Sequence, residues 1–152
     1  MSYLTVPSPV GELTIFEEDD SIVALEFGKA PANSEKPSAL LKRAAWQLDE
    51  YFEGKRAAFD LPLKPAGTAF QRKVWARIAA IPQGRVETYG AIAKKLRSGA
   101  RPVGAACGAN PIPLLIPCHR VLGSNGGLGG YSGAGGVTTK RFLLAREGVE
   151  AR

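Results

Sequence analysis

The chain has 152 residues, 45% of them apolar, and a formal net charge of +6, so it can bury a core in one domain or in two small ones. No apolar run approaches the roughly 18 residues of a membrane span, and the opening MSYLTV lacks a signal peptide's basic and apolar stretches, so we expect a cytoplasmic protein without membrane contact. Two cysteines and one histidine predict reduced thiols and exclude a structural zinc site.

The charge is divided unevenly along the chain. Residues 1–60 hold eleven Asp and Glu against six Lys and Arg, whereas residues 61–152 hold three against fourteen. So basic a segment attracts a polyanion through counterion release, and nucleic acid is the commonest such partner. The alternative is a solvated basic surface that serves solubility, and charge alone does not decide between the two.

The first part of the chain predicts a small α+β domain. Apolar residues alternate around an acidic turn at 17–20, as in a hairpin; they are Leu13, Ile15, Val23, Leu25 and Phe27. A helix is expected from its cap, Ser38, to Gly54, with an apolar face of Leu41, Ala45, Leu48 and Phe52 over the hairpin. We find no catalytic constellation here. Two prolines and a glycine in 60–68 predict a linker, between domains 1–65 and 66–152.

The second part begins with helical patterns. Thr68 and Gln71 form a capping box ahead of an apolar stripe. TYGAIAKKL (88–96) and RPVGAACGAN (101–110) then predict two short helices joined by a turn with a glycine, the outline of a helix-turn-helix. An ordinary helical hairpin is the alternative. Basic residues around this unit favour DNA binding; they are Arg85, Lys94, Lys95, Arg97 and Arg101.

The second of these helices carries few side chains that could read DNA bases. Its residues are small, Ala105 among them, and offer no hydrogen bonds to base edges, although they permit close approach. Only Arg101, at the helix start, is long enough to enter a groove. We therefore expect contacts with phosphate and shape, with little sequence preference.

NPIPLLIPCHRV (110–121) sets the only histidine directly after Cys118. Its three prolines predict a stiff, extended segment in which the side chains of Cys118 and His119 point to opposite faces, so that a water would relay a proton between them. A thiol with a pKa of about 8.5 needs such a base, and the imidazole in turn needs a carboxylate from Glu87, Glu147 or Glu150. A buried, inert thiol is the alternative, which suits Cys107 better.

A glycine-rich stretch follows, with eight glycines in residues 121–136. It predicts backbone close to a ligand, with Val121, Leu128 and Tyr131 as pocket walls; a flexible linker is the alternative. Residues 137–148 predict a helix with Val137, Phe142 and either Ala145 or Leu144 inward, stopped by Gly148.

The motifs GANPIPLLI, PCHRV, GGYSG and FLLAREG follow one another, and with them residues 68–152 resemble the methylated-DNA–protein-cysteine methyltransferases, the O6-alkylguanine-DNA alkyltransferases. Residues 1–60 resemble this family only in their α+β pattern. The resemblance implies an α+β fold, with a small ribonuclease-H-like N-terminal α/β domain followed by a mainly helical winged helix-turn-helix domain. It also implies a monomer that repairs double-stranded DNA without a cofactor, by one irreversible transfer of an alkyl group from guanine O6, or less readily thymine O4, to a cysteine.

By position, the resemblance implies that Cys118 is the alkyl acceptor, His119 its water-mediated base and Glu147 the orienting carboxylate. Asn110 would brace the turn before them, and Tyr89 would donate a proton to the departing guanine. The implied DNA contacts are Arg101, which enters the duplex, with Tyr89, Arg120, Lys94 and Ala105. The implied pocket residues are Cys107, Val121, Leu128, Tyr131 and Ser132.

Two features depart from the family pattern, a short turn (RSGA) before Arg101 and the small Cys107 where members often carry a larger side chain. Both concern the range of substrates. Two other classes remain open, a DNA-binding regulator with a structural Cys118 and a Cys-His hydrolase. A hydrolase of that class places its histidine elsewhere in the sequence and needs no basic helical pair.

Overall fold

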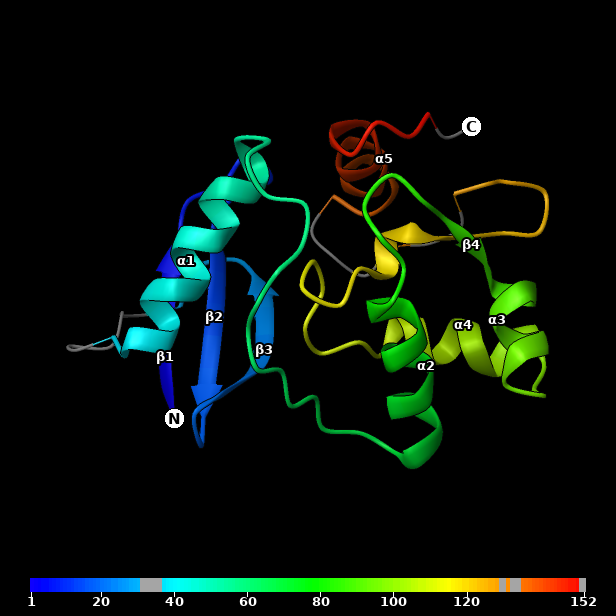
Figure 1. Ribbon diagram of the computed structural model, residues 1–152, viewed down its shortest axis with the longest axis horizontal. Helices are drawn as coiled ribbons and strands as arrows, with labels where there is room; N and C mark the ends of the chain where they lie inside the picture. The colour runs from blue at the N-terminus through cyan, green and yellow to red at the C-terminus, as the bar shows by residue number, and fades with distance from the viewer. Residues whose placement is uncertain (31–36, 129–130, 132–134, 151–152) are drawn as a thin grey trace.

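The computed structural model describes residues 1–30, 37–128, 131 and 135–150, which form two parts side by side (Figure 1). The N-terminal part holds β1 (Ser2–Val6), β2 (Leu13–Glu18), β3 (Ser21–Phe27) and α1 (Ala39–Phe52). The C-terminal part holds α2 (Ala69–Ala79), β4 (Glu87–Thr88), α3 (Tyr89–Lys95), α4 (Ala100–Gly108), the short 3-10 helix η1 (Cys118–Arg120), β5 (Val121–Leu122) and α5 (Val137–Arg146). Among the described residues no helix is long and apolar enough to cross a membrane.

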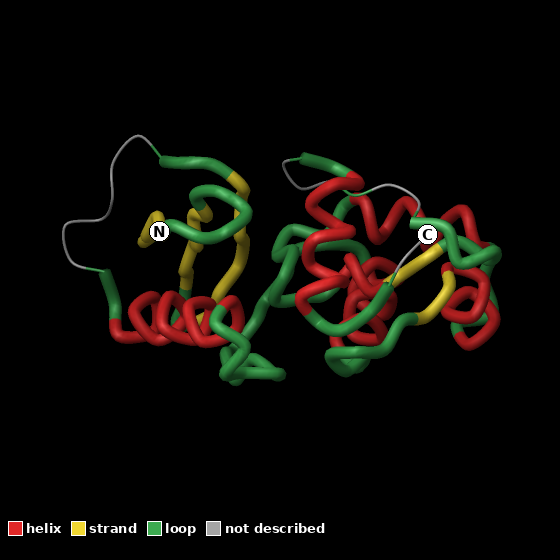
Figure 2. Tube along the Cα trace, turned by 90° about the horizontal axis from the view of Figure 1, so that it is seen from above, coloured by secondary structure: helices red, strands yellow, loops and turns green. Residues whose placement is uncertain are grey.

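The N-terminal part has two layers, an antiparallel sheet in the order β1-β2-β3 and α1 across one face of it (Figure 2). Alternation along β2 buries Leu13 and Ile15 on one face, as the hairpin pattern predicts. Ser38 caps α1 by accepting a hydrogen bond from the Leu41 amide, at 3.0 Å, which confirms the predicted start of the helix. Strand β1 was not predicted from the sequence. All five of its residues are half-buried, so the strand has no clear contrast between a buried and an exposed face.

The segment between the two parts is held against the sheet. Ile22 of β3 donates a backbone hydrogen bond to Pro62 (2.8 Å) and accepts one from Lys64 (2.9 Å). Further along, Gly67 lies so close to the indole of Trp75 that any Cβ atom at this position would clash with it. The predicted linker therefore has a defined path.

The C-terminal part is organised around α2. Its capping box is present, because the Thr68 side chain accepts from the Gln71 amide while the Gln71 side chain accepts from Thr68 N–H. The indole Nε1 of Trp75 donates to the Ala106 carbonyl at 2.8 Å and fastens α4 to α2. Helices α3 and α4 pack together as the predicted helix-turn-helix pair. The parallel pairing of β4 with β5 joins this pair to η1.

The buried face of α5 differs from the predicted one. Val137 and Phe142, expected to point inward, are 40% and 38% exposed. Leu144, one of the two alternatives predicted for the third inward position, is fully buried together with Leu143, while Ala145 is exposed. The same inward face carries Lys140 and Glu147. These polar groups can be buried because both have hydrogen-bond partners. Their hydrogen bonds, together with the buried leucines, therefore decide which face of α5 points inward.

Candidate active site

A closed turn, residues 110–117, carries the chain from α4 into η1. Asn110 closes this turn from inside, since its Nδ2 donates to the Ile116 carbonyl (2.8 Å) and its Oδ1 accepts from the Ile112 amide (2.9 Å). The amide of β3 residue Leu25 also donates to the Pro111 carbonyl, at 2.9 Å. The segment that holds Cys118 is therefore fixed both by its own prolines and by the N-terminal sheet.

The expected extended conformation at Cys118 is wrong, because residues 118–120 form the 3-10 helix η1. The Cys118 amide donates to the Ile116 carbonyl (2.8 Å) and the Arg120 amide to the Pro117 carbonyl (2.9 Å). Three successive side chains therefore fan around a helix axis instead of alternating between two faces. All three are buried, with His119 only 1% exposed.

Glu147, the C-cap residue of α5, accepts hydrogen bonds from three neighbouring side chains. Its Oε2 lies 2.7 Å from His119 Nε2 and accepts from the Tyr51 hydroxyl at 2.5 Å. Arg120 donates through Nε to Oε1 (2.8 Å) and through Nη2 to Oε2 (2.9 Å). Of the three acidic candidates in the second part of the chain, the structure brings Glu147 to His119 and pairs Glu87 with Arg77.

These contacts fix the proton on His119. Burial by itself would raise the pKa of Glu147, but the hydrogen bonds from His119, Arg120 and Tyr51 outweigh it and lower the pKa to about 2. An ionised carboxylate can only accept, so the imidazole donates through Nε2 and keeps a lone pair on Nδ1. Nδ1 is buried and has no hydrogen-bond partner among the described residues. Burial also lowers the pKa of His119, so the ring is a neutral base at neutral pH.

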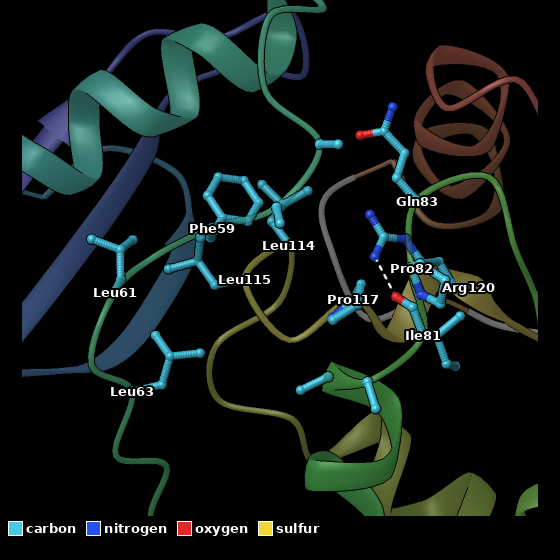
Figure 3. A pocket seen from close by; sticks show the side chains of 14 residues that line it. Phe59, Leu61, Leu63, Ile81, Pro82, Gln83, Leu114, Leu115, Pro117 and Arg120 are labelled. Atoms are coloured by element: carbon cyan, nitrogen blue, oxygen red, sulfur yellow. Dashed lines mark hydrogen bonds between the residues drawn. The ribbon is translucent and has the colours of Figure 1, made fainter.

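Arg120 does not occupy the DNA-contact position expected from the sequence. Its guanidinium is 6% exposed, holds Glu147 with two donors and gives Nη1 to the Ile81 carbonyl at 2.7 Å. Figure 3 shows this last bond beside the cavity between the two parts. The expectation was wrong because a buried carboxylate needs a buried cation, and Arg120 provides one.

The surroundings of Cys118 keep it protonated at rest. Burial raises the pKa of this thiol, and a hydrogen bond from Asn110 and the charge of Lys140 oppose that rise without cancelling it. A reaction at neutral pH therefore requires a base for the thiol proton, which is the role that Nδ1 of His119 can fill.

Lys140 is a site residue that the sequence reading missed. It is fully buried, its Nζ donates to the Val121 carbonyl at 2.7 Å, and Nζ lies 5.9 Å from the centre of the Tyr89 ring. Burial lowers its pKa, while the nearby thiols act in the opposite sense. Helical spacing could have found it, because Lys140 lies seven residues before Glu147 and so shares its face of α5.

Three expected site residues surround the thiol. Burial raises the pKa of both Tyr89 and Cys107 to about 12, with a smaller effect of Cys118 on each. Tyr131 packs its ring edge-on against Phe27, with 6.2 Å between the centroids, and its buried hydroxyl has no partner among the described residues.

The other expected pocket residues are placed differently. Val121 belongs to the main hydrophobic core, and Leu128 packs with Leu122 and Leu144 in a smaller cluster. Ser132 lies outside the described residues. Among those residues, no group of His, Cys, Asp and Glu side chains could hold a metal ion.

Three of the five residues expected to contact DNA are exposed on the helix pair. Lys94 at the end of α3, and Arg101 and Ala105 on α4, are exposed, while Val103 and Ala106 of α4 point into the core. Ala105 offers only a methyl group on this face. Arg101 and Ala105 are four residues apart and share a face of α4, so a DNA phosphate backbone could approach the α4 backbone closely beside Arg101.

Comparison with known proteins gives the same result for both parts. Residues 1–65 match the family model described as 6-O-methylguanine DNA methyltransferase, ribonuclease-like domain, and residues 69–149 match the DNA binding domain of the same family. A methylated-DNA–protein-cysteine methyltransferase of Methanosarcina acetivorans is 38% identical, over 97% of this chain and 99% of the relative. A constitutive one of Bacillus subtilis is 40% identical, over 97% and 95%.

Solved structures agree in fold. Mycobacterium tuberculosis O6-methylguanine methyltransferase superposes with a TM-score of 0.84 at 37% identity, over 99% of this chain and 94% of that one. The same organism's OGT in complex with DNA also gives a TM-score of 0.84, at 39% identity, over 95% of this chain and 91% of that one. Both parts of the chain are thus matched together, in one arrangement.

Proposed function

This chain belongs to the 6-O-methylguanine DNA methyltransferase family, and we propose that it repairs DNA by direct reversal, in one irreversible transfer of a methyl or other alkyl group from guanine O6 to Cys118. The observation that carries the proposal is the buried pair of Glu147 and His119, with His119 next to Cys118 in η1 and its Nδ1 without a partner among the described residues. The N-terminal part, residues 1–65, is the ribonuclease-like domain, and residues 66–152 bind DNA and accept the alkyl group.

The proposed reaction consists of a proton transfer from the thiol followed by transfer of the alkyl group. The proton of the Cys118 thiol passes to His119 Nδ1 through one water, and Glu147 stabilises the imidazolium that forms. The thiolate attacks the alkyl carbon, an S–C bond forms, the C–O6 bond breaks, and its electron pair stays on the guanine. Tyr89, whose raised pKa keeps its hydroxyl protonated, passes a proton to the departing base and is reprotonated through solvent at the expense of the imidazolium, so that the net transfer moves the thiol proton to guanine. The product thioether is stable, so each molecule acts once.

The exposed residues of α3 and α4 indicate how the protein would bind its DNA substrate. Lys94 and Arg101 contact phosphate and groove, and no side chain of α4 reads base edges, so sequence preference is small. The alkylated base must rotate out of the stack to reach a buried thiol. We propose a monomer that acts on double-stranded DNA in the cytoplasm, on the nucleoid in a bacterium, with O4-alkylthymine as a poorer substrate.

The test is a duplex with a single O6-methylguanine, mixed with the protein and followed by intact mass and peptide mapping. We expect a mass gain of one methylene group on the Cys118 peptide and restored guanine in the DNA. Binding without any mass gain would favour a regulator with a structural cysteine. Thioester hydrolysis activity without methyl transfer would favour a Cys-His hydrolase.

Arg101→Ala tests how the damaged base leaves the stack. A long side chain that fills the vacated space offsets part of the few kcal/mol that flipping costs. We expect the variant to transfer sharply more slowly from a methylated duplex, by about tenfold or more, and at the normal rate from free O6-methylguanine, which needs no flipping. Single-turnover rates on both substrates give the answer.

If Arg101 only contacts a DNA phosphate, Arg101→Ala should give a different result. Its loss would weaken binding to every duplex alike and reduce the salt dependence of binding by about one unit. Equal rate losses on duplex and free base would rule out a role in flipping. Lys94→Ala is the matched control, because it removes one exposed charge of the helix pair from α3 and leaves α4 unchanged.

A further inference from the structure

Tyr51 brings a side chain of the N-terminal part into the buried cluster around His119. Its hydroxyl donates to Glu147 Oε2 at 2.5 Å, across 96 residues of sequence, and both side chains are buried. The ring is held from two sides, with centroids 5.0 Å from Phe52 and 5.4 Å from Phe59. The phenol therefore sits on the carboxylate in one fixed orientation.

The oxygen that Tyr51 contacts is the one that faces His119. Oε2 accepts from the phenol and from Nε2 of the imidazole, whereas Oε1 accepts only from Arg120. A donor on Oε2 draws negative charge away from the imidazole, so a protonated ring gains less from the carboxylate. Arg120 Nη2 also donates to Oε2, and the two additional donors lower the basicity of this oxygen, so the Nε2 proton stays on the imidazole.

We propose that Tyr51 is a positioning residue of the transfer reaction: through Glu147 it holds His119 in the neutral form, with the proton on Nε2 and the lone pair on Nδ1. The proposal rests on the function proposed above. It gives the N-terminal part a role in the chemistry of Cys118, although that part contributes no group to the reacting atoms.

The charged and titratable groups around this cluster come from several elements. Glu147 and Arg120 face both the phenol and the imidazole, Lys140 of α5 acts on the imidazole, and Tyr131 acts on the phenol. Burial, followed by the charge of Glu147, raises the pKa of Tyr51 far above its usual range. The phenol is therefore a donor at every pH at which the protein is folded, and any change of His119 with pH belongs to the imidazole.

The experiment uses Tyr51→Phe, which removes the hydroxyl and keeps the ring. His119 is the only histidine of the chain, so its imidazole NMR signals need no assignment strategy. We expect its titration midpoint to rise by about half a unit, a roughly threefold change in proton affinity. The acidic limb of the single-turnover rate should move to higher pH by the same amount, so the variant is about threefold slower on that limb and equal to the parent protein on the plateau.

Tyr3→Phe is the matched control. It makes the same change of side chain on β1, where the Tyr3 ring packs against Phe16 with 5.7 Å between the centroids, away from the cluster around Glu147. This variant should keep both the His119 titration and the rate profile. A titration in Tyr51→Phe that superimposes on that of the parent protein, or a slowing that is uniform with pH, would overturn the proposal.

The His119 titration is measured on the protein without DNA, so it does not depend on transfer. If the parent protein fails to gain a methyl group, the proposed function fails, whatever the titration shows. If the parent protein accepts the methyl group but Tyr51→Phe leaves the titration unchanged, only the role of Tyr51 fails. Thermal unfolding of both variants confirms that the compared samples are folded.

Discussion

Cys118→Ala will abolish alkyl transfer and leave DNA affinity within about twofold of that of the parent protein. In the proposed function the sulfur carries the reaction, while binding depends on phosphate contacts made by exposed basic residues such as Lys94. Cys118 is 5% exposed, so its truncation removes almost no surface that DNA could touch. Fluorescence anisotropy on methylated and unmodified duplexes, combined with intact mass after incubation, measures both quantities.

Cys107→Ala is the matched control for this variant. Both thiols are buried and free, and burial raises the pKa of each, but only Cys118 is followed by His119. The control should still gain one methyl group on the Cys118 peptide. A methyl group on Cys107 in the Cys118→Ala protein, or an equal loss of binding and transfer, would contradict the assignment of the acceptor.

Local chemistry made the secondary structure predictable. Ser38, Thr68 and Thr88 each cap a helix with a side chain that accepts from a backbone amide three residues ahead, so a few letters of sequence suffice to set each start. The hairpin was visible as well, since Leu13, Ile15 and Leu25 are buried as the alternation predicts, but a register shift at Phe16 and Glu17 leaves Ile22 buried and Val23 only half-buried. Strand β1 was not predicted, since its five residues are all half-buried and show no contrast between a buried and an exposed face.

The site was predictable where its residues are adjacent in sequence and not where they meet through the fold. Cys118 and His119 could be recognised together, but η1 depends on Arg120 turning inward to a carboxylate 27 residues away. Tyr51 reads as one more apolar position of α1, because an aromatic ring at helical spacing is most often a core residue. Its hydroxyl gains a hydrogen-bond partner, Glu147, only when α5 is packed against the N-terminal part.

Glu147→Gln will slow transfer on the order of 100-fold at neutral pH, and less at alkaline pH. Glutamine keeps the shape but presents an NH2 group to the donors of the cluster. That group cannot accept from any of them, and the neutral amide no longer stabilises the imidazolium that forms when His119 takes the thiol proton. At high pH hydroxide ionises the thiol directly, and because burial raises the pKa of Cys118 above that of an ordinary thiol, this recovery should begin only at strongly alkaline pH.

The same substitution should also destabilise the fold. Arg120 would stay buried without a counter-ion, a change that costs about 3–5 kcal/mol. The pKa of Glu147 is lowered from an ordinary 4.5 to about 2, so its stabilising effect is fully present above pH 4.5 and is lost as the pH falls toward 2. Urea unfolding should therefore show a large difference between the two proteins at pH 6 and a smaller one at pH 3.

Glu87→Gln separates the relay from the general effect of breaking an ion pair. Glu87 binds Arg77 with two hydrogen bonds, of 2.9 and 3.3 Å, but lies at β4 and does not contact His119. Because this pair is part-exposed, we expect a loss of about 1 kcal/mol or less and an unchanged pH profile of transfer. If Glu147→Gln were slowed by the same factor at every pH, its effect would be one of folding, and the proton path from Cys118 to His119 would have to run without the carboxylate.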